Sequence, residues 1–298
     1  MTKQSSTRLR ELTAQRVPFV HATVVRAQVP TSARAGDDAI VLSDGSIEGF
    51  VGGQCAQTSV RTAALGALRD GQSVLLRVLP DGDVDFPDAP GAQVVVNTCL
   101  SGGALEIFLE PMLPSPLVEI VGDTPVADAL VAIAEVLGYA TARSLPGEHP
   151  SGASALIVAS HGVDEPKAIR AALDSGVGYI ALVASHRRGS AVLDELGATP
   201  AERARISTPA GLDIGAQTAP EVALSILAEV ITAVRRPDAL TTTVSAFVAA
   251  QAPQTAIDPV CGMTVTIMPD TPQLVIDGQT YWFCNPHCRV TFAETSRQ

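Results

Sequence analysis

The first part of the chain contains short apolar segments around one amphipathic segment. Apolar and β-branched side chains predict strands at residues 17–29, 39–42, 74–79, 94–96 and 104–109. Between them, apolar side chains recur at helical spacing over residues 58–68, and Gly71 follows as a stop signal. We therefore predict a mixed α+β domain that ends near Pro111.

A different pattern follows the prolines near residue 114. Short apolar runs alternate with helical segments, which predicts strands at 117–122, 138–142, 155–159 and 179–183 and helices at 125–137, 165–174 and 221–234. Thr218 and Glu221 have capping-box spacing before the last helix, with Pro220 in its first turn. Alternating strands and helices indicate a doubly wound parallel sheet of Rossmann-like type.

These patterns predict an α/β protein with four segments. They are an N-terminal domain (1–113), a Rossmann-like domain (114–236), a linker rich in Ala, Thr and Pro (237–256) and a C-terminal module (257–298). A module of about forty residues buries little core and usually needs a metal ion or another staple.

Composition narrows the classes of partner. The net charge of −11 argues against nucleic acid or an anionic membrane surface. The polar N-terminus lacks the apolar core of a signal peptide, and no apolar run reaches transmembrane length. We therefore expect a cytoplasmic protein with no membrane partner. In that reducing compartment, five cysteines indicate ligands or reactive thiols rather than a disulfide framework.

Two motifs in the N-terminal domain place a thiol beside glycines. The residues concerned are Gly52, Gly53 and Cys55 in the first motif and Cys99, Gly102 and Gly103 in the second. Glycine lets backbone N–H groups approach a ligand, and a helix N-terminus after the first motif would attract an anion and favour thiolate. Taken alone, each motif fits a tight turn around a buried cysteine better than a ligand site. Together they indicate a site for an anionic, sulfur-reactive ligand.

The turn after the first Rossmann strand departs from the dinucleotide fingerprint. Gly122 and Ala127 fit G-x-G-x-x-G/A, but Thr124 replaces the glycine that lets backbone approach pyrophosphate. Asp123 would place negative charge beside the phosphates, and Arg143 follows the second strand where an acid would bind ribose. The turn supports the fold and argues against NAD(P).

Two further loops follow predicted sheet strands, where such folds place ligand contacts. His161 could contact a ligand with Asp164 as its orienting partner, or it could simply precede the next helix. Arg187 and Arg188 form the densest basic patch; they suit a phosphate or carboxylate, or they form a solvated helix start.

The C-terminal module contains Cys261, Cys284 and Cys288. Three thiols with a fourth nitrogen or oxygen ligand could form a tetrahedral site for zinc or copper. His287 is the natural fourth ligand, and Asp258 or water is the alternative.

Residues 211–229 resemble the signature of the XdhC/CoxI family, and the resemblance extends over about residues 15–236. Other matching segments are 52–55, 99–103, 160–164 and 184–188. Residues 258–263 and 281–284 resemble the YHS module, a small metal-associated domain.

The resemblance favours a non-catalytic accessory protein over an enzyme. XdhC-like proteins bind molybdenum cofactor (molybdopterin), protect it during sulfuration and pass it to a xanthine dehydrogenase or carbon monoxide dehydrogenase. The implied partners are the apo-form of such a molybdenum hydroxylase and a cysteine desulfurase, with homodimerisation. The cofactor-binding residues are then the six glycines and cysteines of the two motifs together with Arg34, His161, Arg187 and Arg188.

Two alternatives remain open from the sequence. One is an NAD(P)-dependent oxidoreductase, which Thr124 and Arg143 argue against. The other is a metal carrier or sensor that acts through the C-terminal module.

Overall fold

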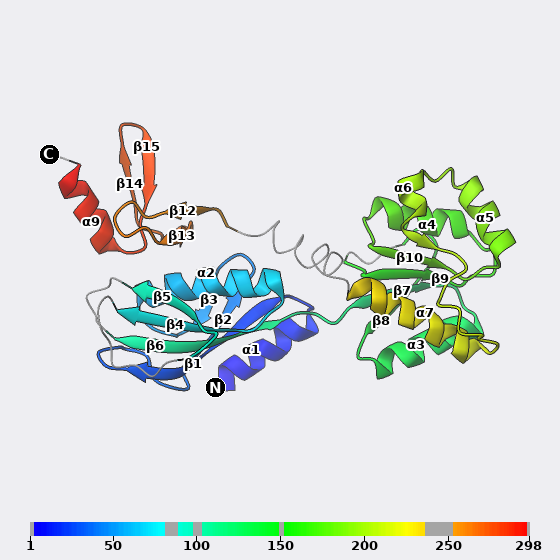
Figure 1. The fold of residues 1–298 in the computed structure, drawn as a ribbon, viewed down its shortest axis with the longest axis horizontal. Coiled ribbons are helices and arrows are strands. Elements are labelled where there is room, and N and C mark those ends of the chain that lie inside the picture. The colour runs from blue at the N-terminus through cyan, green and yellow to red at the C-terminus, as the bar shows by residue number, and fades with distance from the viewer. Residues whose placement is uncertain (1–2, 81–88, 98–102, 149–151, 236–252, 297–298) are drawn as a thin grey trace. The chain divides into compact units, whose positions relative to one another are not determined.

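The computed structural model describes residues 3–80, 89–97, 103–148, 152–235 and 253–296 (Figure 1). The chain forms two compact units. One unit comprises residues 1–114 and 244–298, and the other comprises residues 115–243. The C-terminal module therefore belongs to the same unit as the N-terminal domain.

The N-terminal domain is built on a six-stranded sheet with the order β3-β2-β1-β6-β4-β5. The strands are β1 (Phe19–Gln28), β2 (Asp38–Leu42), β3 (Ile47–Gly49), β4 (Val74–Pro80), β5 (Gln93–Asn97) and β6 (Ala104–Met112). All neighbouring strands are antiparallel except β4 and β5, which are parallel.

Two helices pack on this sheet (Figure 1). Helix α2 (Gln54–Asp70) buries Val60, Ala64 and Leu68 in the main core, as its apolar spacing predicts. Helix α1 (Lys3–Ala14), for which the sequence analysis has no prediction, packs Leu12 into a smaller cluster with Phe19 and Ile40.

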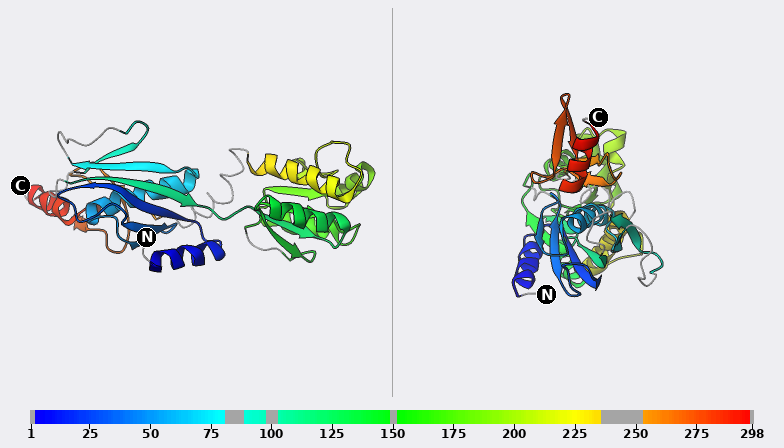
Figure 2. Two further views of the ribbon diagram at one scale, coloured as in Figure 1. Left: turned by 90° about the horizontal axis from the view of Figure 1, so that it is seen from below. Right: turned by 90° about the vertical axis from the view of Figure 1, so that its left-hand side faces the viewer.

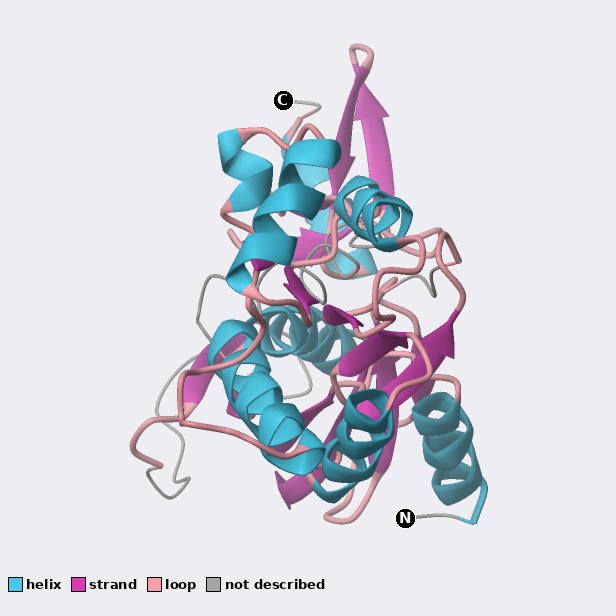
Figure 3. Cartoon of the chain, turned by 90° about the vertical axis from the view of Figure 1, so that its right-hand side faces the viewer, coloured by secondary structure: helices cyan, strands magenta, loops and turns pink. Residues whose placement is uncertain are grey.

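The second unit contains a parallel five-stranded sheet with the order β11-β10-β9-β7-β8. The strands are β7 (Leu117–Val121), β8 (Ala140–Ser144), β9 (Ala155–Val158), β10 (Tyr179–Leu182) and β11 (Ile206–Ser207). Helices α3 (Pro125–Val136) and α7 (Ala219–Val234) lie side by side on one face (Figure 2, left), and α4 (Glu165–Asp174) and α5 (His186–Glu195) cover the other (Figure 1). Helices surround the strands on both faces, so the predicted Rossmann-like fold is confirmed (Figure 3).

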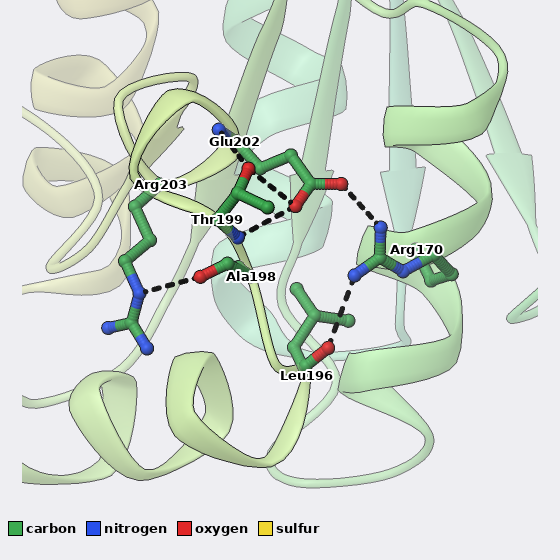
Figure 4. Close-up of polar contacts among 6 residues, drawn as sticks. All are labelled: Arg170, Leu196, Ala198, Thr199, Glu202 and Arg203. Carbon is green, nitrogen blue, oxygen red and sulfur yellow. Dashed lines mark hydrogen bonds and ion pairs between the residues drawn. The ribbon is translucent and has the colours of Figure 1, made fainter.

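Local capping signals determine where two helices of this unit begin. The predicted capping box before α7 is present: Thr218 Oγ1 accepts the Glu221 N–H, and the Glu221 carboxylate accepts the Thr218 N–H. Thr199 and Glu202 form the same box at α6 (Pro200–Arg203), where Arg170 also donates to Glu202 at 2.6 Å (Figure 4). The Thr199 N–H and Arg170 lower the pKa of Glu202 to about 2.

The C-terminal module consists of two hairpins and a helix. The first hairpin pairs β12 (Thr255–Ile257) with β13 (Thr264–Thr266), and the second pairs β14 (Gln273–Ile276) with β15 (Gln279–Trp282). Helix α9 (Pro286–Thr295) follows. Most of the predicted linker, 237–256, lies outside the described residues, and β12 begins within its last part. In the described part of the chain, no helix combines the length and apolarity needed to cross a membrane.

Candidate functional site

A cavity of about 540 Å³ lies at the carboxyl edge of the Rossmann sheet. It is lined by residues at or just after the ends of β7, β8 and β9, among them Gly122, Arg143 and His161. Strand β7 lies between β8 and β9, so the chain leaves β7 and β9 toward opposite sides of the sheet. Doubly wound sheets bind ligands at such a switch point.

Gly122 is required by the packing of the two central strands. Its φ is +119°, and a Cβ there would lie 2.3 Å from the carbonyl oxygen of Ala159.

Arg143 closes the side of the cavity formed by β8. Its guanidinium donates to Asp123 at 3.1 Å and also pairs with Asp128. Surface ion pairs of this kind are weak, so Arg143 remains available to an anionic ligand.

The loop that carries His161 has an unusual backbone. His161 and Asp164 both have positive φ, at +53° and +49°, which costs free energy for residues with a Cβ. Glu165, which is 1% exposed, accepts the Gly162 N–H at 2.9 Å and holds this loop. Asp164 is the N-cap of α4 without a side-chain capping bond.

The structure separates the three basic residues predicted to contact phosphate. His161 is exposed and lines the cavity, whereas Arg187 is exposed and is not among the lining residues. Arg188 donates to Glu165 and to the Val183 carbonyl oxygen, each at 2.5 Å, so its guanidinium supports the loop. Ser185 caps α5, in agreement with the alternative of a helix start.

The first Gly/Cys motif forms the N-terminus of α2. The helix begins at Gln54, and Gly53 is its N-cap in extended conformation without a side-chain capping bond. Gly53 is exposed and has open space around its Cα, whereas Gly52 has a φ of +134° and packs against Ala56 and Leu105. The first backbone N–H groups of this helix have no partner within the helix, so an anion can approach them at Gly53.

Cys55 differs from the prediction of a reactive thiol. It is buried and disulfide-bonded in this structure, whereas Cys261, Cys284 and Cys288 are free.

The second motif lies partly outside the described residues, which exclude Cys99 and Gly102. Gly103 is described and packs directly against the backbone of Pro30: a Cβ there would lie 2.3 Å from the Pro30 carbonyl oxygen. Arg34 is exposed in the same β1–β2 loop, where its N–H donates to Asp37 at 2.8 Å. Gly103 directly precedes β6, and a Cβ at Gly52 would lie 3.3 Å from Leu105 in the same strand, so these two glycines both lie near the start of β6.

The C-terminal module brings four ligand-type side chains together. One ligand atom from each of Asp258, Cys261, Cys284 and Cys288 lies within 4.8 Å of all the others. The Cys284 sulfur lies 3.5 Å from that of Cys261 and 3.7 Å from that of Cys288. Tetrahedral zinc with Zn–S bonds of about 2.3 Å separates its sulfurs by about 3.8 Å, so the arrangement fits a tetrahedral thiolate site. His287 is exposed and does not belong to this group.

Two polar side chains organise this cluster. Asp258, fully buried, accepts the N–H groups of Val260 and Cys284, each at 2.8 Å. Asn285 donates to the Cys284 sulfur at 3.1 Å while its oxygen caps α9 at Cys288 N–H. Amide donors beside sulfur are typical of thiolate metal ligands, which they orient and stabilise.

Burial determines the protonation of the metal-free cluster. It raises the pKa of the Cys284 thiol far above its ordinary value, with Asp258 adding to the effect, and raises that of Cys288 to about 11. Burial alone would raise the pKa of Asp258, but hydrogen bonds from the Cys284 and Val260 N–H groups lower it. Metal binding must therefore release thiol protons.

Sequence reasoning missed three residues that the structure places at these sites. Glu165 lies at the start of α4, and its partner Arg188 is brought close only by folding, whereas Asn285 acts on its sequence neighbour Cys284 and caps α9. The sequence analysis treats Arg143 only as the residue that stands where an acid would bind ribose, whereas its position near the end of β8 places it in the lining of the cavity.

The comparisons with known proteins agree with the fold. The model described as the XdhC Rossmann domain matches residues 118–230, and the one described as the XdhC and CoxI family matches residues 12–78. Together these segments cover more than half of the chain, and the chain belongs to the XdhC and CoxI family.

Two individual proteins are also similar to this chain. The uncharacterized protein YqeB of Escherichia coli (strain K12) is 26% identical over 250 residues, which cover 74% of this chain and 44% of that protein. The chain thus spans less than half of that relative's length. A crystal structure described as a xanthine dehydrogenase from Bacillus halodurans is 15% identical, with a TM-score of 0.37, over 77% of this chain and 95% of that one.

Proposed function

We propose that this protein is a non-catalytic accessory protein that binds molybdenum cofactor and assists its sulfuration and insertion into a molybdenum hydroxylase. The target would be an enzyme of the xanthine dehydrogenase or carbon monoxide dehydrogenase type. The observation that carries the proposal is family membership over both units. The matched segments contain the turn before Cys55 and the loops around the Rossmann cavity.

The N-terminus of α2 supports the first half of this proposal. Molybdopterin is a phosphorylated dithiolene, so its holder needs an anion site and surroundings that tolerate sulfur. The open space at Gly53 gives a phosphate access to the first backbone N–H groups and to the positive end of the helix dipole. Exposed Arg34 supplies a positive charge from a neighbouring loop of the same domain.

A role for Cys55 requires a change of redox state. Its sulfur is disulfide-bonded in this structure and cannot ligate a metal in that form. A dithiol reductant would supply two electrons and two protons, converting the disulfide to two thiols and becoming a disulfide itself. In this proposal the reduced Cys55 and Cys99 contact the molybdenum or its sulfur.

The experiment is cofactor binding by the full chain under anaerobic conditions. Molybdenum and pterin are quantified after incubation with free cofactor and gel filtration, with and without dithiothreitol. We expect reduced wild type to retain cofactor and the Cys55→Ser/Cys99→Ser variant to lose most of it. Cys261→Ser is the matched control, since it changes a thiol of the C-terminal module. Equal retention by all three proteins, or none by wild type, would contradict the proposal.

The partners follow from the same role. An apo-hydroxylase would receive the cofactor, and a cysteine desulfurase would supply its sulfur. Reconstitution tests this step: purified apo-hydroxylase should gain activity when incubated with the loaded protein and gain little from the same amount of free cofactor. Equal activation by free cofactor would argue against a delivery role.

The convergence of four ligand-type atoms supports a second function for the C-terminal module. We propose that Asp258, Cys261, Cys284 and Cys288 hold a zinc or copper ion. The expected stoichiometry is one ion per chain by mass spectrometry of the native protein. Cys284→Ser should abolish binding, whereas His287→Ala should leave it unchanged because His287 lies outside the cluster. Loss of binding in His287→Ala would overturn the assignment of Asp258.

A further inference from the structure

The C-terminal module packs on the outer face of α2, although the two are more than 180 residues apart in sequence. Thr58 Oγ1 donates to the carbonyl oxygen of Cys284 at 3.4 Å, and Thr62 Oγ1 lies 3.4 Å from Thr266 Oγ1. Thr58 is 6% exposed and Thr266 is 1% exposed. Helix α2 thus buries two faces, an apolar one against the sheet and a threonine-bearing one against the module.

A second contact involves the turn between β2 and β3. Gly45 lies so close to the module that a Cβ there would be 3.2 Å from Pro253 Cγ and 3.3 Å from Met268 Sδ. Arg61 donates to the Gly45 carbonyl oxygen at 2.7 Å; burial lowers the pKa of Arg61, and Asp270 of the module partly offsets this. The C-terminal module and the N-terminal domain therefore share an interface formed by several residues rather than a single contact.

The interface leaves little room for solvent. A cavity of about 20 Å³ lies between the two surfaces and is large enough for about one water molecule. Its lining includes Gln54, the first residue of α2, as well as Phe283 and Cys284 of the module. The docked module therefore reaches the helical turn that contains Cys55.

Cys284 connects this interface to the candidate metal cluster. Its sulfur belongs to the cluster, its N–H donates to Asp258, and its carbonyl oxygen accepts from Thr58. The module's own core is small, with Val265, Phe283, Cys284 and Cys288 as its buried members. A core of this size depends on a staple, so the position of the Cys284 carbonyl depends on what holds the sulfurs together.

We propose that metal binding at the Asp258, Cys261, Cys284 and Cys288 cluster controls the docking of the C-terminal module on α2. The metal-loaded module covers the face with Thr58 and Thr62. The metal-free module loses the geometry of Cys284 and leaves that face, including the turn beside Cys55, open to solvent. This inference rests on the proposed metal site. It assigns to the module a regulatory role at the N-terminal site.

Thermodynamic linkage supplies the test. If metal binding favours docking, docking must favour metal binding by the same factor, so a variant that blocks docking lowers metal affinity without touching a ligand. Thr62→Arg places a long charged side chain at the contact with Thr266. Asp70→Arg is the matched control, because it adds the same side chain at the exposed end of α2.

The measurement is the zinc dissociation constant of the full-length chain by competition with a chromophoric chelator. We expect Thr62→Arg to weaken zinc binding about fivefold or more and Asp70→Arg to leave it unchanged. Unchanged affinity in Thr62→Arg would overturn the docking proposal while leaving the metal site intact. Absence of both zinc and copper binding by wild type would instead overturn the metal site, and the docking proposal with it.

Hydrogen exchange of wild type gives an independent readout if Thr62→Arg fails to fold. Peptides covering residues 43–47 and 54–62 should exchange more slowly with zinc than after chelation. Peptides from β1 and β6, away from the module, should be unaffected. Equal exchange of the α2 peptides in a sample shown to contain zinc would contradict the proposal.

Discussion

One guanidinium nitrogen of Arg188 lies 2.5 Å from both carboxylate oxygens of Glu165, and the same carboxylate accepts the Gly162 N–H at 2.9 Å. The start of α5 is thereby joined to the loop after β9. That loop carries His161 in a strained conformation beside the Rossmann cavity. The sequence suggests Arg188 as a ligand contact, but its guanidinium instead pairs with Glu165, which holds the loop that carries His161.

Removing one member of this pair should destabilise the Rossmann unit. Glu165→Ala leaves a charged guanidinium and a backbone N–H without their acceptor. We expect a loss of about 3 kcal/mol in the free energy of unfolding, the low end for a buried pair because Arg188 is 35% exposed. Urea unfolding checks this value. The control Glu195→Ala removes an exposed carboxylate of α5 and should change stability by less than about 0.5 kcal/mol.

Gly122 and Gly162 allow a matched test of close packing at the switch point. Both have positive φ, at +119° and +98°, but only Gly122 has an atom where a Cβ would lie. Gly162→Ala should cost about 1–2 kcal/mol through backbone strain. Gly122→Ala should cost clearly more, because the clash with Ala159 forces β7 and β9 apart. Similar melting temperatures for the two variants would show that the strands can shift freely.

The cysteines should differ in reactivity in a defined order. In chelator-treated protein we expect iodoacetamide to label Cys261 before Cys284 and Cys288, which are 2% and 4% exposed. Because burial raises the pKa of Cys288 to about 11, its labelling rate should rise about tenfold per pH unit between pH 7 and 9. Cys55 should react only after reduction of its disulfide. Peptide mass spectrometry measures all four rates.

Two substitutions of Asn285 should separate its effect on zinc affinity from its effect on the stability of α9. Asn285→Ala removes both the N-cap of α9 and the N–H donors to sulfur, so stability should fall by about 1 kcal/mol and zinc affinity about 10–100-fold. Asn285→Asp keeps an acceptor for the cap but lacks the donors, so zinc affinity should fall while the metal-free protein keeps its stability. A variant with unchanged zinc affinity would show that the N–H···S contacts are not needed.

Local patterns along the chain were sufficient for much of the fold. Thr218 and Glu221 are three residues apart, and their capping box forms as predicted because its hydrogen bonds are closed within one turn. The spacing of apolar side chains also predicts the strands and helices of the Rossmann unit, because that spacing reflects which side of each element faces the core. The three cysteines of the C-terminal module could likewise be recognised as ligand candidates from their spacing and number.

Other features depend on residues that meet only in the folded chain. Asp258 rather than His287 completes the cysteine cluster because the β12–β13 turn places its carboxylate beside Cys284, whereas the helical direction of α9 turns His287 to solvent. The contact between Thr58 and Cys284 joins positions 226 residues apart, for which no local pattern exists. Periodicity reports how one element faces its surroundings. The identity of the partner on each face depends on the packing of whole elements, which a single sequence does not display.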